Sequence, residues 1–198
     1  MSVDNPIQFY DAASREATNV EDSPWFPVYE EAARYIGNGA ASIVELGCGT
    51  GRFAKLLMQR EHAGEYIGLD ISPACIKAAQ DYVQHPNFRF EVADLRAVYS
   101  FAPADRPIAG HTTYVCLEVL EHLADDLELV SRIPTGHTFI FSVPTHPSQS
   151  HIRTFPNVSS VWARYQEILF MKRWALIDCG SGRAIHVVQS TKRSDSWL

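Results

Sequence analysis

Short, continuous apolar runs alternate along the chain with longer segments in which apolar residues recur every three or four positions. Runs of the first kind are typical of strands buried on both faces, and segments of the second kind are typical of amphipathic helices. The pattern therefore predicts strands over SIVEL (42–46), EYIGLDIS (65–72), FRFEVADL (88–95), TTYVCLEV (112–119), HTFIFSVPT (137–145), WALIDCG (174–180) and AIHVVQST (184–191).

Helices are expected before and between most of these strands. Ser72 is a favoured N-cap residue, and Pro73 suits the first position of the helix that follows. The helical periodicity covers WFPVYEEAARYI (25–36), GRFAKLLMQRE (51–61), PACIKAAQDYV (73–83), LEHLADDLELVSRI (120–133) and VSSVWARYQEILFMKRW (158–174).

The alternation predicts an α/β fold, a three-layer sandwich with a mostly parallel seven-stranded sheet and an antiparallel strand from a C-terminal hairpin. The hairpin is expected because Gly180, Ser181 and Gly182 join the last two strands. We expect one domain over 1–198. It would comprise an N-terminal lid and helix (1–39), a cofactor-binding core (40–145), and a substrate loop, helix and terminal hairpin (146–198).

Composition and charge narrow the class of protein. The formal net charge of -6 argues against a nonspecific nucleic-acid binder, and no apolar run reaches the length of a membrane span. The N-terminus lacks the basic and then apolar pattern of a signal peptide. The four cysteines are scattered without a C-x-x-C pair, which is typical of reduced thiols in a cytoplasmic protein.

Acidic residues and glycines gather at the carboxyl ends of the predicted strands. Glu45, Asp70, Asp94 and Glu118 stand at or near the ends of the first four strands, and GCGTG (47–51) follows the first. Ligands of parallel sheets bind beyond these ends, and glycines let the backbone approach a ligand closely. A carboxylate at the second strand end can accept hydrogen bonds from both hydroxyls of a ribose.

The glycine turn does not fit two common nucleotide sites. A dinucleotide fold requires G-x-G-x-x-G, but Arg52 occupies the third glycine position. A phosphate-binding loop requires a lysine, and the turn has none. A ligand with adenine, ribose and a zwitterionic tail without phosphate fits the residues better.

The motifs resemble those of the class I S-adenosylmethionine-dependent methyltransferases. VELGCGTGRFA resembles the first motif of that family, IGLDIS the second, VADL the adenine-contacting motif and CLEVLEHL the segment after the fourth strand. SVPT followed by HIRTF resembles the small-molecule group that includes ubiquinone-biosynthesis-type O-methyltransferases. The resemblance covers about residues 40–190, and it implies S-adenosylmethionine as cofactor and S-adenosylhomocysteine as product.

The resemblance also implies a set of cofactor-binding residues. Glu45 and the glycine backbone would hold the methionine part, Asp70 the ribose, and Asp94 the adenine amino group. The full set is Tyr10, Glu45, Gly47, Cys48, Gly49, Gly51, Asp70, Ile71, Asp94, Leu95, Leu117 and Glu118. Three of these assignments have a structural alternative: tight packing alone for the glycine turn, an ordinary turn residue for Asp94, and an N-terminal aromatic without a role for Tyr10.

Methyl transfer to a hydroxyl requires a base near the methyl group. We expect His122 to be that base, because an imidazole titrates near neutral pH and His122 follows the fourth strand. His151 and Arg153 are the expected substrate residues, with loop bracing as the alternative for Arg153. We expect residues 1–24 and 144–155 to form a lid over the site.

Two alternatives concern the acids beside His122. Glu118, Glu121 and His122, with His151 from the loop, could hold a divalent metal ion, as in the similar E-x-x-E-H run of small-RNA 2′-O-methyltransferases. We prefer the interpretation of His122 as a base to that of a metal site. Acids at this position also favour a helix N-terminus without any catalytic role.

The predicted function is methyl transfer to a small molecule, at oxygen, by a monomer or homodimer. The alternatives are an RNA or protein methyltransferase and a non-catalytic S-adenosylmethionine-binding domain. Residue patterns do not identify the acceptor, because loops build that pocket.

Overall fold

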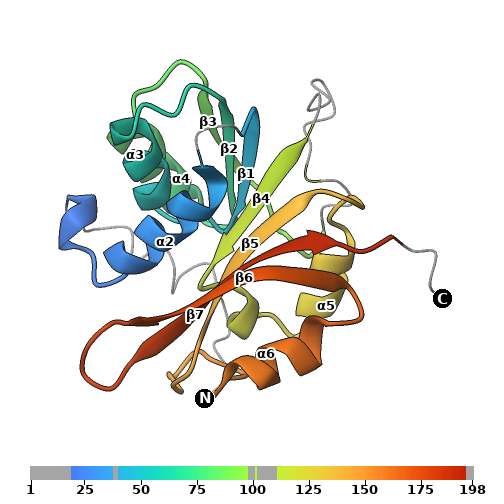
Figure 1. Ribbon diagram of the computed structural model, residues 1–198. Coiled ribbons are helices and arrows are strands. Elements are labelled where there is room, and N and C mark those ends of the chain that lie inside the picture. Colours follow the sequence, from blue (N-terminus) through green and yellow to red (C-terminus); the bar gives the residue numbers. More distant parts are fainter. Residues whose placement is uncertain (1–18, 38–39, 98–100, 102–110, 195–198) are drawn as a thin grey trace.

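The computed structural model describes residues 19–37, 40–97, 101 and 111–194, so Tyr10 and most of the predicted N-terminal lid lie outside it. One seven-stranded sheet runs in the order β3-β2-β1-β4-β5-β7-β6 (Figure 1). The strands are β1 (Ser42–Leu46), β2 (Glu65–Asp70), β3 (Phe88–Val92), β4 (Thr112–Leu117), β5 (Thr138–Pro144), β6 (Leu169–Asp178) and β7 (Ala184–Lys192).

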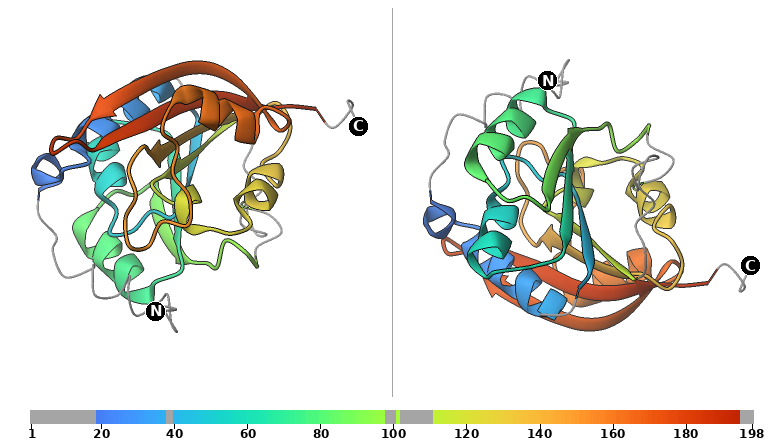
Figure 2. Two further views of the ribbon diagram at one scale, coloured as in Figure 1. Left: turned by 90° about the horizontal axis from the view of Figure 1, so that it is seen from below. Right: turned by 90° about the horizontal axis from the view of Figure 1, so that it is seen from above.

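Helices cover both faces of the sheet and complete the predicted three layers. One face carries α2, α3 and α4, and the other carries α5 and α6 (Figure 2). Successive β1 residues divide between the two cores, since Ile43 packs with the first helix group and Val44 with the second. The helical segments are η1 (Val20–Asp22), α2 (Phe26–Ile36), α3 (Arg52–Gln59), α4 (Pro73–Tyr82), η3 (Leu120–His122), α5 (Asp126–Ser131) and α6 (Val158–Tyr165).

The strand connections put the predicted site at one edge of the sheet. β1 pairs in parallel with β2 on one side and with β4 on the other, so the order of strands reverses at β1. Ligands of such sheets bind at this reversal, beyond the carboxyl ends. β7 is antiparallel to both β5 and β6, which confirms the predicted hairpin.

Two predicted helices differ from the structure. The segment 120–133 contains only the turn η3 and the short helix α5, because Leu123 between them is extended. The i, i+3 and i+4 spacing of Glu118, Glu121 and His122 predicts that all three lie on one helix face. This prediction is wrong, because Glu118 precedes η3 and has a left-handed φ of 56°. The segment 158–174 is helical only to Tyr165, since its second half pairs with β7 as strand β6.

Local signals in the sequence were otherwise reliable. The Ser72 hydroxyl accepts the Cys75 N–H at 3.0 Å and caps α4 as predicted. All four cysteines are free thiols, three of them buried. Within the described ranges, no helix combines the length and the apolar character needed to cross a membrane.

Candidate active site

The glycine turn after β1 carries three left-handed glycines with different surroundings. Gly47, Gly49 and Gly51 have φ of 79°, 51° and 78°. A Cβ on Gly47 would overlap the Val119 side chain, whereas a Cβ on Gly49 would meet nothing within 4 Å. Gly47 is therefore required by packing, and Gly49 keeps open space in which a ligand can lie against the backbone.

Asp70 is held at the end of β2 by the same turn. Its two carboxylate oxygens accept the Gly49 N–H and the Ser72 N–H, both at 2.9 Å. These bonds orient the carboxylate and leave each oxygen with capacity for a further donor. The arrangement suits the recognition of a diol such as that of ribose.

Glu45 is a buried acid behind the turn. Its side chain is 3% exposed, and it accepts a hydrogen bond from the Tyr66 hydroxyl. Burial raises the pKa of Glu45 to about 8, although the Tyr66 bond acts in the opposite direction. Glu45 is therefore mainly protonated at neutral pH, and a cationic group placed beside it would favour its ionised form.

Two cavities meet at the glycine turn. The Trp25 cavity, of about 230 Å³, is bounded by Trp25, Tyr29 and Glu45 among others. The His122 cavity, of about 390 Å³, extends past Ile71 to His122. The residues that line both are Gly47, Gly49, Asp70, Leu117 and Glu118. A ligand with two chemically different ends can therefore extend through both cavities.

The Trp25 cavity includes residues that the sequence did not single out. Trp25 and Tyr29, at the start of α2, and Arg52, at the start of α3, contribute to its walls. The aromatic side chains of Trp25 and Tyr29, ahead of the first strand, could have indicated a ligand contact, but the helical periodicity of 25–36 predicted only a helix. Cys48 also lines this cavity. Gly51 is the N-cap of α3 and lines neither cavity, and Ala79 would lie 3.0 Å from a Cβ added to it.

Ile71, Asp94 and Leu95, which are predicted to contact adenine, line the His122 cavity together. Asp94 forms a two-point ion pair with Arg96, at 2.9 and 2.8 Å. The Arg96 hydrogen bonds are the main cause of the lowered pKa of Asp94. An adenine amino group would have to share this carboxylate with Arg96.

Glu118 stands where the two cavities join. Its left-handed backbone is uncommon for a residue with a side chain and marks a site of strain. The carboxylate accepts a hydrogen bond from the Ser142 hydroxyl at 2.8 Å, and a polar contact with Trp25 lowers its pKa. Burial raises its pKa to about 7.

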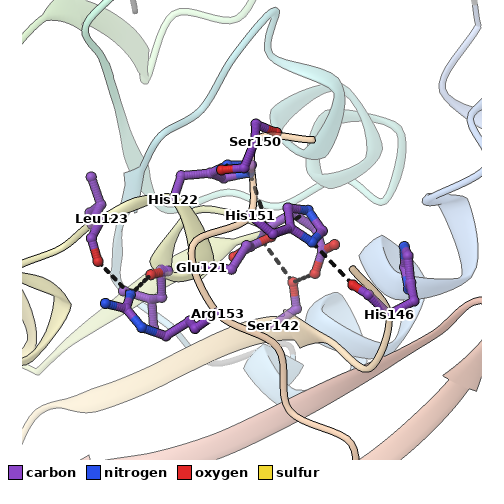
Figure 3. A network of polar contacts seen from close by, with 10 residues as sticks. Glu121, His122, Leu123, Ser142, His146, Ser150, His151 and Arg153 are labelled. Carbon is purple, nitrogen blue, oxygen red and sulfur yellow. Dashed lines mark hydrogen bonds and ion pairs between the residues drawn. The ribbon is translucent and has the colours of Figure 1, made fainter. Parts of the chain in front are cut away.

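A second polar cluster adjoins the His122 cavity and consists of Glu121, His122 and His151 (Figure 3). One side-chain ligand atom of each residue lies within 4.8 Å of those of the other two. Glu121 is fully buried, and neither of its carboxylate oxygens has a hydrogen-bond partner. Its pKa is raised, first because of burial and then because of the charge of Glu118.

Hydrogen bonds fix the tautomers of the two histidines. Nδ1 of His122 lies 3.0 Å from the Ser150 carbonyl, and Nδ1 of His151 lies 3.1 Å from the His146 carbonyl. Each Nδ1 must carry the proton, because a carbonyl only accepts, so in the neutral ring Nε2 bears a lone pair. These Nε2 atoms lie 3.7 and 3.9 Å from the same Glu121 oxygen.

Arg153 braces the loop after β5. Its guanidinium donates to the carbonyl of Leu123 (Figure 3) and to that of Leu120, and it pairs with Asp126 at 3.3 Å. These bonds join the loop to the segment that carries His122. Of the two roles expected for Arg153, the geometry favours bracing over contact with substrate.

Comparisons with known proteins agree with this arrangement. A methyltransferase-domain family model matches residues 43–133. The chain is 27% identical over 135 residues to a trans-aconitate 2-methyltransferase of Azoarcus sp., covering 66% of this chain and 50% of that protein. It is 38% identical over 104 residues to a malonyl-[acyl-carrier protein] O-methyltransferase of Paenibacillus sp., covering 50% and 37%.

A solved structure of the N-methyltransferase NodS from Bradyrhizobium japonicum, in complex with S-adenosylhomocysteine, superposes with a TM-score of 0.71. Its sequence is only 16% identical, but the match covers 96% of this chain and all of that one, which establishes a shared fold. The chain spans about half the length of the trans-aconitate methyltransferases it matches. Residues 43–133 are therefore similar in sequence to a methyltransferase-domain family, and the sheet has the fold of a solved methyltransferase.

Proposed function

We propose that this protein transfers a methyl group from S-adenosylmethionine to an oxygen atom of a small molecule, with His122 as the base. The observation that carries the proposal is the position of His122 in the wall of the cavity that Asp70 and the glycine turn also line. The nucleoside would occupy the part of this cavity near Ile71 and Asp94. The methionine end would enter the Trp25 cavity, and the acceptor would approach from the side of His122.

The protein's main contributions would be alignment and the exclusion of water. Transfer from a sulfonium is an in-line displacement of an activated methyl group, so no protein nucleophile is needed. A hydroxyl acceptor loses its proton as it attacks, and Nε2 of His122 would accept that proton. Burial lowers the pKa of His122 and keeps the imidazole in its neutral, basic form.

The relatives support a small acceptor and leave its identity open. Their names specify trans-aconitate in one case and a malonyl group on a carrier protein in the other. The net charge of -6 disfavours RNA as acceptor. The four free thiols favour a cytoplasmic location. We also expect a monomer or homodimer, with the lid and the domain boundaries predicted from the sequence.

A metal-assisted site is the second candidate, and the unpartnered Glu121 favours it. One carboxylate oxygen and two Nε2 lone pairs converge, and each histidine donates its other N–H to a backbone carbonyl, as metal-binding histidines usually do. The residues therefore fit a divalent cation, held by Glu121, His122 and His151. Glu118 is outside this group, because its carboxylate is bonded to Ser142 and its ligand atoms do not join those of the other three residues. A bound metal would lower the pKa of an acceptor hydroxyl.

Turnover screens against phenols, carboxylates, amines and transfer RNA test the proposal. Methylation of a hydroxyl or carboxylate would support it, and methylation of RNA alone, or none of any acceptor, would contradict it. With an acceptor in hand, full activity in excess EDTA and an inactive His122→Ala variant would identify the base. Activity lost in EDTA and restored by Mn²⁺ or Mg²⁺, with Glu121→Gln equally impaired, would instead identify the metal site.

A further inference from the structure

We propose that the Glu118 carboxylate is the counter-charge of the cofactor's sulfonium and makes the site distinguish the methyl donor from its product. This inference rests on the proposed function, since it presumes that S-adenosylmethionine extends through both cavities. The inference gives the side chain of Glu118 a role in ligand specificity, in addition to the contacts of its backbone with the ligand.

The junction of the two cavities determines where the sulfonium would lie. The sulfur atom connects the methionine chain to the nucleoside, so it must sit between the groups that occupy the two cavities. Of the residues that line both, only Asp70 and Glu118 are acidic. Asp70 is oriented by Gly49 and Ser72 toward a diol, which leaves Glu118 as the acid opposite the sulfur.

The surroundings of Glu118 hold its carboxylate at this junction. The Ser142 hydroxyl donates to Oε1 at 2.8 Å, and the Ser142 Oγ also accepts the Glu118 N–H at 2.9 Å. Trp25 lines the same cavity as Glu118 and provides a polar contact that lowers the pKa of this carboxylate. A carboxylate that is held by Ser142 and carried on a strained backbone is pre-organised, and pre-organised charge discriminates between ligands.

The chemistry of the two ligands makes the effect selective. S-adenosylmethionine carries a positive charge on sulfur, and S-adenosylhomocysteine is a neutral thioether with the same ammonium, carboxylate and nucleoside. A buried anion beside the sulfur therefore stabilises the donor and does little for the product. Methyl transfer removes the charge, so the same contact would favour release of the product.

Glu45, a buried acid in the Trp25 cavity, provides the control for Glu118. Glu45 lines only the Trp25 cavity, where the amino-acid end common to both ligands would lie. Replacing Glu45 should change the affinity for both ligands by the same factor. Replacing Glu118 should change the ratio of the two affinities.

Calorimetry at pH 8 with S-adenosylmethionine, S-adenosylhomocysteine and sinefungin, whose amine replaces the sulfonium, tests the inference. Glu118→Gln keeps the size and the acceptor oxygen, and should weaken the two cationic ligands on the order of tenfold while changing S-adenosylhomocysteine less than about twofold. Trp25→Phe removes the polar contact of the indole with the carboxylate and should shift the ratio in the same direction by a smaller factor. Glu45→Gln should leave the ratio unchanged.

The outcomes separate this inference from the proposed function. Equal losses for all three ligands in Glu118→Gln would overturn the counter-charge and leave the cofactor site intact. Failure of the wild-type protein to bind any of the three would contradict the proposed function itself. If Glu118→Gln does not fold, an unchanged ratio in both Trp25→Phe and Ser142→Ala would overturn the inference.

Discussion

Alanine at Gly47 should mainly reduce stability, whereas alanine at Gly49, two positions along the same turn, should mainly reduce ligand binding. Both residues have left-handed φ, which costs a non-glycine residue about 1–2 kcal/mol. At Gly47 the added Cβ also overlaps Val119, and overpacking of this kind costs about 1–3 kcal/mol more. Gly47→Ala should therefore lower the free energy of unfolding by roughly 2–5 kcal/mol, and Gly49→Ala by roughly 1–2 kcal/mol.

The order of the two variants should reverse for ligand binding, with the larger loss of affinity in Gly49→Ala. The Cβ of Gly49→Ala would enter the open space that the ligand is expected to fill, so the folded variant should bind S-adenosylhomocysteine weakly. Urea unfolding and calorimetry on the same samples measure both quantities. Val119→Ala added to Gly47→Ala should recover about 1 kcal/mol or more relative to the sum of the single variants.

Two results would refute this reasoning. Wild-type affinity in Gly49→Ala would show that no ligand lies against that part of the turn. Additive effects of Gly47→Ala and Val119→Ala would show that the predicted overlap is not the cause of the lost stability.

Other predictions concern pH, the loop and the lid. The pKa of Glu45 is raised to about 8 in the folded protein, above the value of 4.5 for an unperturbed glutamate. The contribution of Glu45 to the stability of the ligand-free protein should therefore be fully present below pH 4.5 and be lost as the pH rises toward 8. Glu45→Gln should match the wild type at low pH and exceed it by a few kcal/mol at pH 8 in thermal unfolding; a parallel pH profile would contradict the buried acid. Arg153→Met should cost about 2–4 kcal/mol in urea unfolding, since it leaves carbonyls and Asp126 with fewer partners, and unchanged stability with a weakened acceptor would restore the substrate role. Hydrogen exchange over 144–155 should slow when the cofactor binds, and equal protection with and without cofactor would argue against a lid.

The sequence predicted the part of the fold that local patterns determine. The five parallel strands and the left-handed turn after β1 follow from apolar runs and glycine spacing, and each acid at a strand end occupies the expected edge of the sheet. The segment 158–174 was predicted as one helix because its periodicity continues past Tyr165. The observed strand depends on pairing with β7, a tertiary contact that local periodicity does not report.

The roles of side chains could be predicted where neighbouring residues of one segment contribute to the same site. Glu121 and His122 were expected in a common site, and they meet His151 there. Loop bracing by Arg153 was one of the two expected roles, but its partners depend on a contact between distant segments, from the loop to Leu120. The place of Trp25 in a cavity with Glu118 depends on such a contact as well. Such contacts leave no short-range signal in the chain.

The most direct test of the account is calorimetric titration of S-adenosylmethionine and S-adenosylhomocysteine into the wild-type protein and into Asp70→Ala. Asp70 is the acid that both cavities share and that the glycine turn orients. The account predicts binding of both ligands by the wild type and a loss of affinity on the order of a hundredfold or more in Asp70→Ala, since a charge-assisted two-point contact is removed. Unchanged affinity in Asp70→Ala, or tight binding of NAD by the wild type, would contradict it.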